Sequence, residues 1–271
     1  MHCHNININY NIFNNKYQYN TSFGNQKRDT ISSNDSVKTS YESQMRSFLD
    51  NSIIIDIPQV SDDTKIVKDI YPITNPHWIL VRPKDKILSL AEIDKDNSFI
   101  SDLENIKTYL KNTYPEQDVV FFEHGSGTIS QNGEKFVKSA GKSVMFAHAH
   151  FCVLPKGVKG IYPQILKDTK EILLRNNWNK IDTIGYKSSK FLPDFENIAK
   201  QHKIKKENFP PYILISYMDN ETGKEESTIL LEPLGARTPS QLLRKVVAGQ
   251  VNDSKDDSTW DWRMYLAQLK K

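Results

Sequence analysis

Cysteine is scarce in this chain of 271 residues. The only two are Cys3 and Cys152, too few for the disulfide framework of a small secreted protein. Cys3 also lies in a segment whose composition predicts disorder, so we expect it not to pair with Cys152.

Long hydrophobic runs and an excess of one charge are missing as well. No stretch approaches the roughly 18 apolar residues that cross a bilayer, and the first residues lack the basic and apolar regions of a secretory signal. The 36 basic residues nearly balance the 33 acidic ones, for a net charge of +3. We therefore expect a cytoplasmic protein with no membrane contact and no dedicated nucleic-acid surface.

What the chain does contain is enough apolar material for a core, at 38% hydrophobic and 10% aromatic residues. Residues 1–45 are rich in Asn, Ser, Thr and Lys without helical or strand period, which predicts a disordered tail. After it, apolar runs predict strands at 53–55, 65–70, 78–83, 119–122 and 144–154. Helical spacing predicts a helix at 96–114, and the polar segment between 125 and 142 reads as a loop.

The second half continues the mixture of short elements. Helices are predicted at 161–177 and 194–202, and strands at 181–184, 212–217 and 227–231, the last two joined by a hairpin turn. Thr238 and Pro239 predict the N-cap and first turn of a final helix whose apolar face includes Leu243 and Val247. The fold class expected from this order is α+β.

One predicted strand has reactive side chains at positions where apolar packing residues are usual. In the segment 148–155, His-Ala-His-Phe-Cys-Val-Leu-Pro, the alternation of a strand places His148, His150 and Cys152 on one face. Three same-face positions given to two imidazoles and a thiol indicate a functional site.

This pattern resembles the histidine-triad superfamily, whose members carry His-φ-His-φ-His on such a strand. The segment 69–84, D-I-Y-P-I-T-N-P-H-W-I-L-V-R-P-K, is similar to the family's D-I-x-P…H-x-L-V-x-P-K block. Glu123, His124 and Gly125 stand where the family has N-E-G, and residues 141–144, G-K-S-V, resemble its G-Q-S-V with two extra residues before His148. The resemblance covers about residues 51–155.

The resemblance implies a HIT-like antiparallel sheet with flanking helices and a covalent mechanism. The middle histidine, His150, would attack the α-phosphorus of a nucleotide or dinucleoside polyphosphate, and His148 would help to position it. A neutral imidazole is a competent nucleophile at neutral pH. We place the catalytic domain at 46–160 and a C-terminal α+β extension packed on it at 161–271. No cofactor is expected, and small members of the family form homodimers.

The binding residues that the resemblance implies lie before and around the triad. Asp69 would accept hydrogen bonds from the ribose hydroxyls and Ile70 would lie against the base. Phosphate contacts would come from the loop before the triad and from the end of the preceding strand: Glu123, His124, Lys142 and Ser143. A turn role for Asp69 and a strand-end role for His124 are the plain alternatives.

Two features leave the function open. Cys152 replaces the third histidine with a weak hydrogen-bond donor, which suits either a changed substrate or a degenerate nucleotide-binding protein. His148, His150 and Cys152 could instead bind zinc, with His77 or His124 as a further ligand.

Near the C-terminus, Trp260, Trp262 and Arg263 resemble the tail of some long microbial family members. They would either close over the base or phosphate or anchor a terminal helix.

Overall fold

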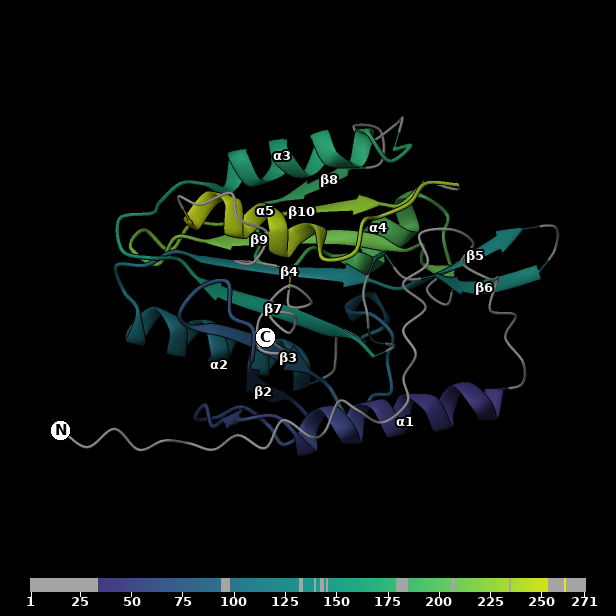
Figure 1. Cartoon of the computed structure of the whole chain (residues 1–271), viewed down its shortest axis with the longest axis horizontal. Helices are drawn as coiled ribbons and strands as arrows, with labels where there is room; N and C mark the ends of the chain where they lie inside the picture. The colour runs from purple at the N-terminus through teal and green to yellow at the C-terminus, as the bar shows by residue number, and fades with distance from the viewer. Residues whose placement is uncertain are drawn as a thin grey trace, which may run out of the picture. The chain divides into compact units, whose positions relative to one another are not determined.

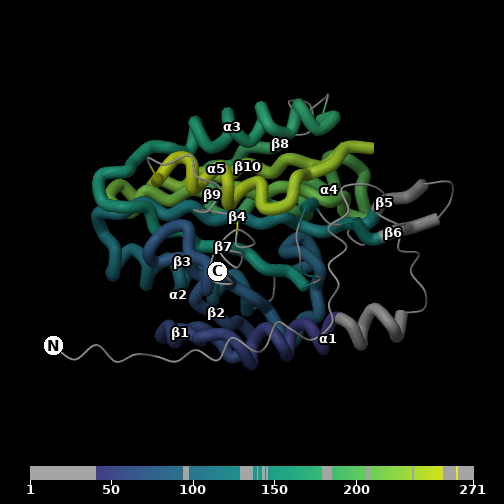
Figure 2. Tube along the Cα trace, in the orientation of Figure 1, coloured from purple at the N-terminus to yellow at the C-terminus, as the bar shows by residue number. Residues whose placement is uncertain are grey.

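The architecture was obtained as a computed structural model. It describes residues 34–93, 98–131, 134–138, 140–141, 144, 146–178, 185–205, 208–233, 235–252 and 261. Figure 2 traces this course along the chain. The predicted tail before residue 34 and the predicted strand at 181–184 lie outside the described residues.

An antiparallel sheet of eight strands forms the centre of the fold (Figure 1). From one edge to the other its strands are β1 (Ile54–Ile55), β2 (Lys65–Lys68), β3 (His77–Val81), β7 (His148–Val153), β4 (Val119–Gly125), β9 (Tyr212–Met218), β10 (Glu225–Leu231) and β8 (Gly185–Ser188). A separate hairpin consists of β5 (Gly127–Gln131) and β6 (Glu134–Lys138). This mixed α+β architecture confirms the predicted fold class.

Helices cover both faces of the sheet. On one face, α2 (Ser98–Thr113) and α4 (Phe195–Gln201) pack on a core that includes Phe121 and Phe151. On the other, α3 (Tyr162–Leu174) and α5 (Leu242–Val251) pack on a core that includes Phe122 and Cys152. In Figure 1, α5 crosses in front of the central strands. A short 3-10 helix, η2 (Leu90–Glu92), contributes Leu90 to the first core.

The alternation of each strand decides which core its side chains enter. In β4, Phe121 belongs to the first core and Phe122 to the second; in β7, Phe151 and Cys152 divide in the same way. Side chains two residues apart therefore share a face. In α2 the buried stripe includes Phe99, whereas the next residue, Ile100, is 40% exposed.

The sheet runs through both halves of the chain. Strands β9 and β10 come from the segment predicted as a C-terminal extension, yet β9 pairs with β4 along its full length, from Val119 opposite Met218 to Gly125 opposite Tyr212. The boundary near residue 160 stays a prediction, in a chain whose central sheet continues across it.

Two local predictions were wrong. Helix α1 (Asn34–Asp50) begins inside the predicted tail, because Tyr41 and Met45 are one helical turn apart and pack on Val81 and Phe146. The predicted loop after residue 125 contains β5 and β6. Their strand-forming residues flank Asn132 and Gly133 in the sequence, a two-residue hairpin signal that we did not use.

Two element boundaries also differ from the prediction. Strand β7 begins at His148, four residues after the expected start at Val144. Helix α5 begins at Leu242 with Gln241 as N-cap, in place of Thr238. The backbone N–H of Leu242 donates to the carbonyl of Pro239 at 3.3 Å, so this proline belongs to a turn before the helix.

Among the described residues, no helix is both long enough and apolar enough to span a membrane.

Candidate functional site

Strand β7 brings its two histidines to the sheet face that α3 and α5 cover. Its neighbour β3 places His77 opposite Cys152 and Ile79 opposite His150. Because side chains alternate along both strands, His77 and His150 point to the same face of the sheet. The pairing of β3 with β7 therefore brings together two imidazoles that are 73 residues apart in the sequence.

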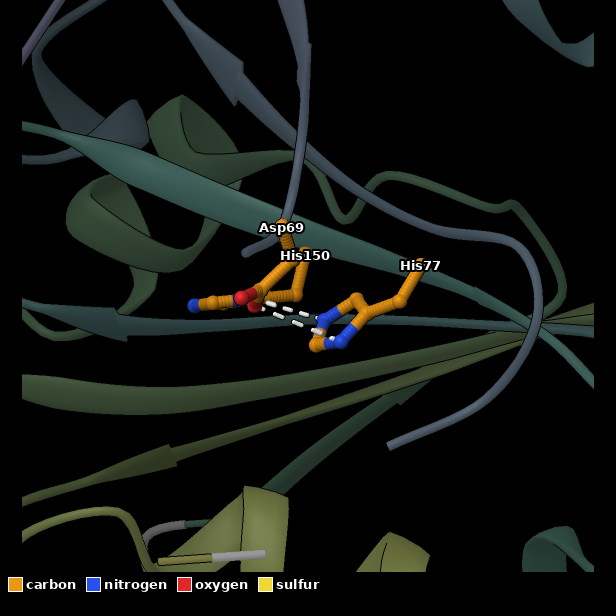
Figure 3. Close-up of side chains that lie close together, drawn as sticks. All are labelled: Asp69, His77 and His150. Atoms are coloured by element: carbon orange, nitrogen blue, oxygen red, sulfur yellow. Dashed lines mark hydrogen bonds and ion pairs between the residues drawn. The ribbon is translucent and has the colours of Figure 1, made fainter. Parts of the chain in front are cut away.

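Asp69 completes a compact cluster with these two histidines (Figure 3). His77 Nε2 lies 3.0 Å from His150 Nδ1. The Oδ2 atom of Asp69 lies 3.3 Å from His77 Nδ1 and 3.6 Å from His150 Nδ1. Asp69 directly follows β2 and is held beside β3, since its backbone N–H donates to the carbonyl of His77 at 2.9 Å.

Arg244, in the first turn of α5, closes the cluster from the other side. Its Nη1 donates to Asp69 Oδ2 at 2.6 Å, and its Nη2 donates to the carbonyl oxygen of Tyr71. The other carboxylate oxygen, Asp69 Oδ1, accepts from the backbone N–H of Tyr71 at 2.8 Å. Asp69 and Arg244 are both buried, so this is a desolvated ion pair.

Burial sets the protonation states of the cluster. It lowers the pKa of His77 and of His150 by more than the carboxylate of Asp69 raises them. Burial alone would raise the pKa of Asp69, but His77, Arg244 and His150 together outweigh it and hold that pKa below its ordinary value. At neutral pH both imidazoles are therefore neutral, and Arg244 is the cation that balances Asp69.

Aromatic contacts fix the ring of His150. It stacks on Phe122, with ring centroids 4.7 Å apart and an interplanar angle of 18°, and meets the ring of His148 edge-on at 5.4 Å. His148 is less buried, and its Nδ1 lies 3.2 Å from the backbone carbonyl oxygen of Phe146. A ring nitrogen of His148 therefore faces a backbone carbonyl, while Nδ1 of His150 faces the imidazole of His77.

The chain of hydrogen bonds has two proton arrangements. In one, the N–H of Ile73, 3.2 Å from His77 Nδ1, donates to it, and His77 Nε2–H donates to His150 Nδ1. In the other, His150 Nδ1–H donates to His77 Nε2 and His77 Nδ1–H points to Asp69. Only the second leaves a lone pair on Nε2 of His150.

The same three side chains could hold a metal ion. With one ligand atom from each residue, the three atoms lie within 4.8 Å of one another, whereas ligand atoms bound to tetrahedral zinc at 2.0–2.1 Å lie about 3.3 Å apart. The guanidinium of Arg244 opposes this, because it already neutralises Asp69 and would repel a divalent cation. The zinc set that we considered from the sequence was different, since it was built on His148, His150 and Cys152.

Cys152 is not at the surface of the site. It has no exposed area and lies in the core that includes Val120 and Leu154. Burial raises the pKa of its thiol, so the group is a neutral thiol at physiological pH.

Glu123 and His124 point to opposite faces of the sheet. Glu123 lies on the face away from His150, fully buried, where it accepts hydrogen bonds from the N–H of Leu90 at 3.0 Å and from the hydroxyl of Tyr212. His124 shares the face of His150, and its Nε2 accepts from the N–H of Leu243 at 3.3 Å. The sequence resemblance had placed both residues near the phosphate.

Ile70 is 51% exposed, so its side chain is open to a ligand beside Asp69. Gly141 has φ of +80°, and a Cβ there would lie 2.6 Å from the carbonyl oxygen of Pro239, so this position of the expected phosphate loop requires glycine. Five of the predicted site residues lie outside the described residues: Lys142, Ser143, Trp260, Trp262 and Arg263.

Sequence reasoning missed two members of the cluster as site residues. His77 appeared within the resembling segment but was considered only as a further zinc ligand. Its position at the start of a strand that carries the family block was an available signal. Arg244 lies in the segment 243–248, which we considered only for its resemblance to the tail of some long family members, because a basic residue in an amphipathic helix ordinarily faces solvent.

Comparisons with known proteins give a sparse result. No family model matches the sequence, and no curated protein matches it. A similar solved structure is that of yeast Ap4A phosphorylase in complex with AMP, with a TM-score of 0.30 and 10% sequence identity over 71% of this chain and 78% of that chain. At this similarity no residue role is carried over to this chain.

Proposed function

We propose that this chain is a nucleotidyl hydrolase or transferase that acts at an α-phosphate through a covalent intermediate on His150. The observation that carries the proposal is the buried chain from Asp69 through His77 to His150, with its 3.0 Å contact between the two imidazoles. A histidine whose Nδ1 proton is held by a partner keeps Nε2 as a nucleophile.

The reaction has two displacement steps at phosphorus. First, the lone pair of His150 Nε2 forms a bond to the α-phosphorus, and the bond from phosphorus to the leaving-group oxygen breaks with its electron pair on that oxygen. His150 keeps its Nδ1 proton, donated to His77. Then water or another acceptor attacks phosphorus, the N–P bond breaks with its electron pair returning to Nε2, and a mononucleotide or its ester is released with loss of one proton.

The geometry around the cluster supports a nucleotide substrate. His148 lies beside His150 on the same face and is partly exposed, which suits a contact with phosphate oxygens. Ile70 offers an exposed apolar surface next to Asp69, which suits a base. Because Arg244 balances the charge of Asp69, the cluster presents no net negative charge that would repel a phosphate.

A second candidate function is nucleotide binding without turnover. The observation that favours it is Cys152, whose buried neutral thiol cannot assist a leaving group from the third triad position. Zinc binding is a third candidate, on Asp69, His77 and His150, and the charge of Arg244 disfavours it.

Covalent capture tests the proposal. The protein is mixed with dinucleoside polyphosphates and quenched in alkaline denaturant, in which a phosphorus–nitrogen bond survives, and its intact mass is measured. We expect a gain of one mononucleotide in the wild type and none in His150→Ala. Since His148 and His150 fall in one tryptic peptide, residues 143–156, fragmentation of that peptide must assign the adduct.

His148→Ala is the matched control, because it removes a neighbouring imidazole of the same strand. It should still form the adduct, more slowly. An adduct on His148 in both the wild type and His150→Ala would contradict the proposal and make His148 the nucleophile. Saturable AMP binding with no adduct on any substrate would favour the non-catalytic candidate.

A further inference from the structure

The carboxylate of Asp69 has little acceptor capacity left for a ligand. Oδ1 accepts from the backbone N–H of Tyr71 at 2.8 Å, and Oδ2 accepts from Arg244 Nη1 at 2.6 Å while facing His77 Nδ1 at 3.3 Å. Its side chain is only 5% exposed. A ribose diol bound by a carboxylate needs acceptor positions that reach the surface, whereas both oxygens of Asp69 are buried and already face donors of the protein.

Arg244 is held in place as firmly as the carboxylate. Its guanidinium spans from Asp69 to the carbonyl oxygen of Tyr71, and its side chain is 9% exposed. The backbone of Arg244 belongs to α5, whose neighbouring residues Leu243 and Val247 are fully buried. The ion pair is therefore fixed from both the sheet side and the helix side.

A sugar would have to displace this pair to reach Asp69. Separating a buried ion pair leaves two uncompensated charges, which costs more than hydrogen bonds from two neutral hydroxyls to one of those charges return. Asp69 therefore stays bound to Arg244 and His77 when a nucleotide enters the site.

We infer that the site does not recognise ribose hydroxyls through Asp69. Arg244 holds that carboxylate beside His77 and His150, so a nucleotide without the 2′- and 3′-hydroxyls loses no contact with Asp69. The inference rests on the proposed function, because that function supplies the nucleotide substrates. It gives Asp69 and Arg244 the role of positioning residues, which act on the nucleotide through His77 and His150.

Sugar discrimination tests this inference directly. Turnover is compared for a dinucleoside polyphosphate with ribose sugars and for its 2′,3′-dideoxy counterpart. A site that reads a hydroxyl through a buried polar group rejects the analogue without it by about 10⁴-fold. We expect the two kcat/KM values to agree within about threefold in the wild type, and Asp69→Asn to reduce both by the same factor.

Variants of Arg244 give a readout that simple loss of structure would not produce. In Arg244→Met the carboxylate is released, so we expect a preference for the ribose substrate to appear. Arg244→Lys, which keeps the charge, should restore the equal use of both sugars. Arg175→Lys, at the exposed end of α3, is the matched control and should behave as the wild type.

Failure of the inference and failure of the proposed function give different results. Wild-type turnover that favours ribose by more than about 10²-fold, with the preference lost in Asp69→Asn, overturns the inference alone. If no substrate is turned over, binding of AMP and of 2′,3′-dideoxy-AMP is compared by calorimetry. Equal affinities then support the inference while the proposed function fails, and a ribose preference or no binding overturns both.

Discussion

At the scale of single residues, the cluster depends on one carboxylate with three partners. Asp69 is beside a cation in Arg244 and two neutral imidazoles in His77 and His150. A carboxylate that lies next to a guanidinium is strongly ionised. It therefore acts as a fixed negative charge that can favour a proton on Nδ1 of His77, which is the arrangement that leaves a lone pair on Nε2 of His150.

The lowered pKa values of the histidines predict how stability depends on pH. The unfolded chain protonates His77 and His150 near pH 6.5, whereas the folded chain does so only at lower pH. Folding stability from these groups is thus complete above pH 6.5 and decreases as the pH falls below it. We expect a loss of about 1–2 kcal/mol between pH 7.5 and 5.5, because each pKa unit corresponds to about 1.4 kcal/mol.

Urea unfolding at several pH values measures this loss. His77→Gln removes one of the two groups, so its unfolding free energy should depend less steeply on pH than that of the wild type. Leu174→Ala, at the exposed C-terminus of α3, removes no imidazole and is the control that should keep the wild-type slope. A slope that is unchanged in His77→Gln would show that the buried imidazoles do not titrate with unfolding.

At the scale of elements, α5 connects packing with chemistry. Its apolar residues Leu243, Val246 and Val247 are buried on the sheet, and that contact fixes where Arg244 meets Asp69. The N–H of Leu243 also donates to His124 of β4. The helix is therefore held by both hydrophobic burial and a hydrogen bond at its first turn.

Shortening one side chain of α5 tests this connection. Leu243→Ala leaves a cavity under the helix and should lower the free energy of unfolding by about 2–5 kcal/mol. Leu174→Ala, at the C-terminus of α3 where the leucine is 49% exposed, should change it by less than about 0.5 kcal/mol. Thermal and urea unfolding of both variants give the comparison. Equal effects would mean that α5 is not anchored through Leu243.

Most helices and strands could be predicted from the sequence, whereas the residues at which they begin and end were harder to predict. The hairpin of β9 and β10 follows from two apolar runs around Asn220 and Gly223, and α3 follows from helical spacing. Prediction failed for α1 because its polar composition hides the stripe of Tyr41 and Met45. It failed for the start of α5 because Pro239 suits a turn as well as a first helical turn.

At the scale of the whole molecule, the site depends on strand order, which local patterns do not contain. The triad strand and its same-face alternation were visible in the sequence. His77 faces His150 only because β3 pairs with β7. Arg244 reaches Asp69, which is 175 residues earlier in the chain, only because α5 packs on the face of the sheet that carries His150. Long-range pairing of this kind is determined by the combined packing of many elements.

The continuous sheet makes a prediction about folding that differs from the domain boundary near residue 160. A fragment of residues 34–160 would lose β9, β10, α3 and α5. This would expose the edge of β4 and the apolar side chains Val120 and Phe122, which are buried in the whole chain. A strand with one unpaired edge and an uncovered core face is unstable in water. We therefore expect no cooperative unfolding transition for this fragment.

Circular dichroism during heating distinguishes the two possibilities. A longer fragment, residues 34–252, keeps every strand of the sheet and should unfold cooperatively like the whole chain, because its core is complete. A cooperative transition in the short fragment would establish an independent first domain. In that case Arg244 would be contributed to Asp69 from a separate folding unit, and the ion pair would be a contact between domains.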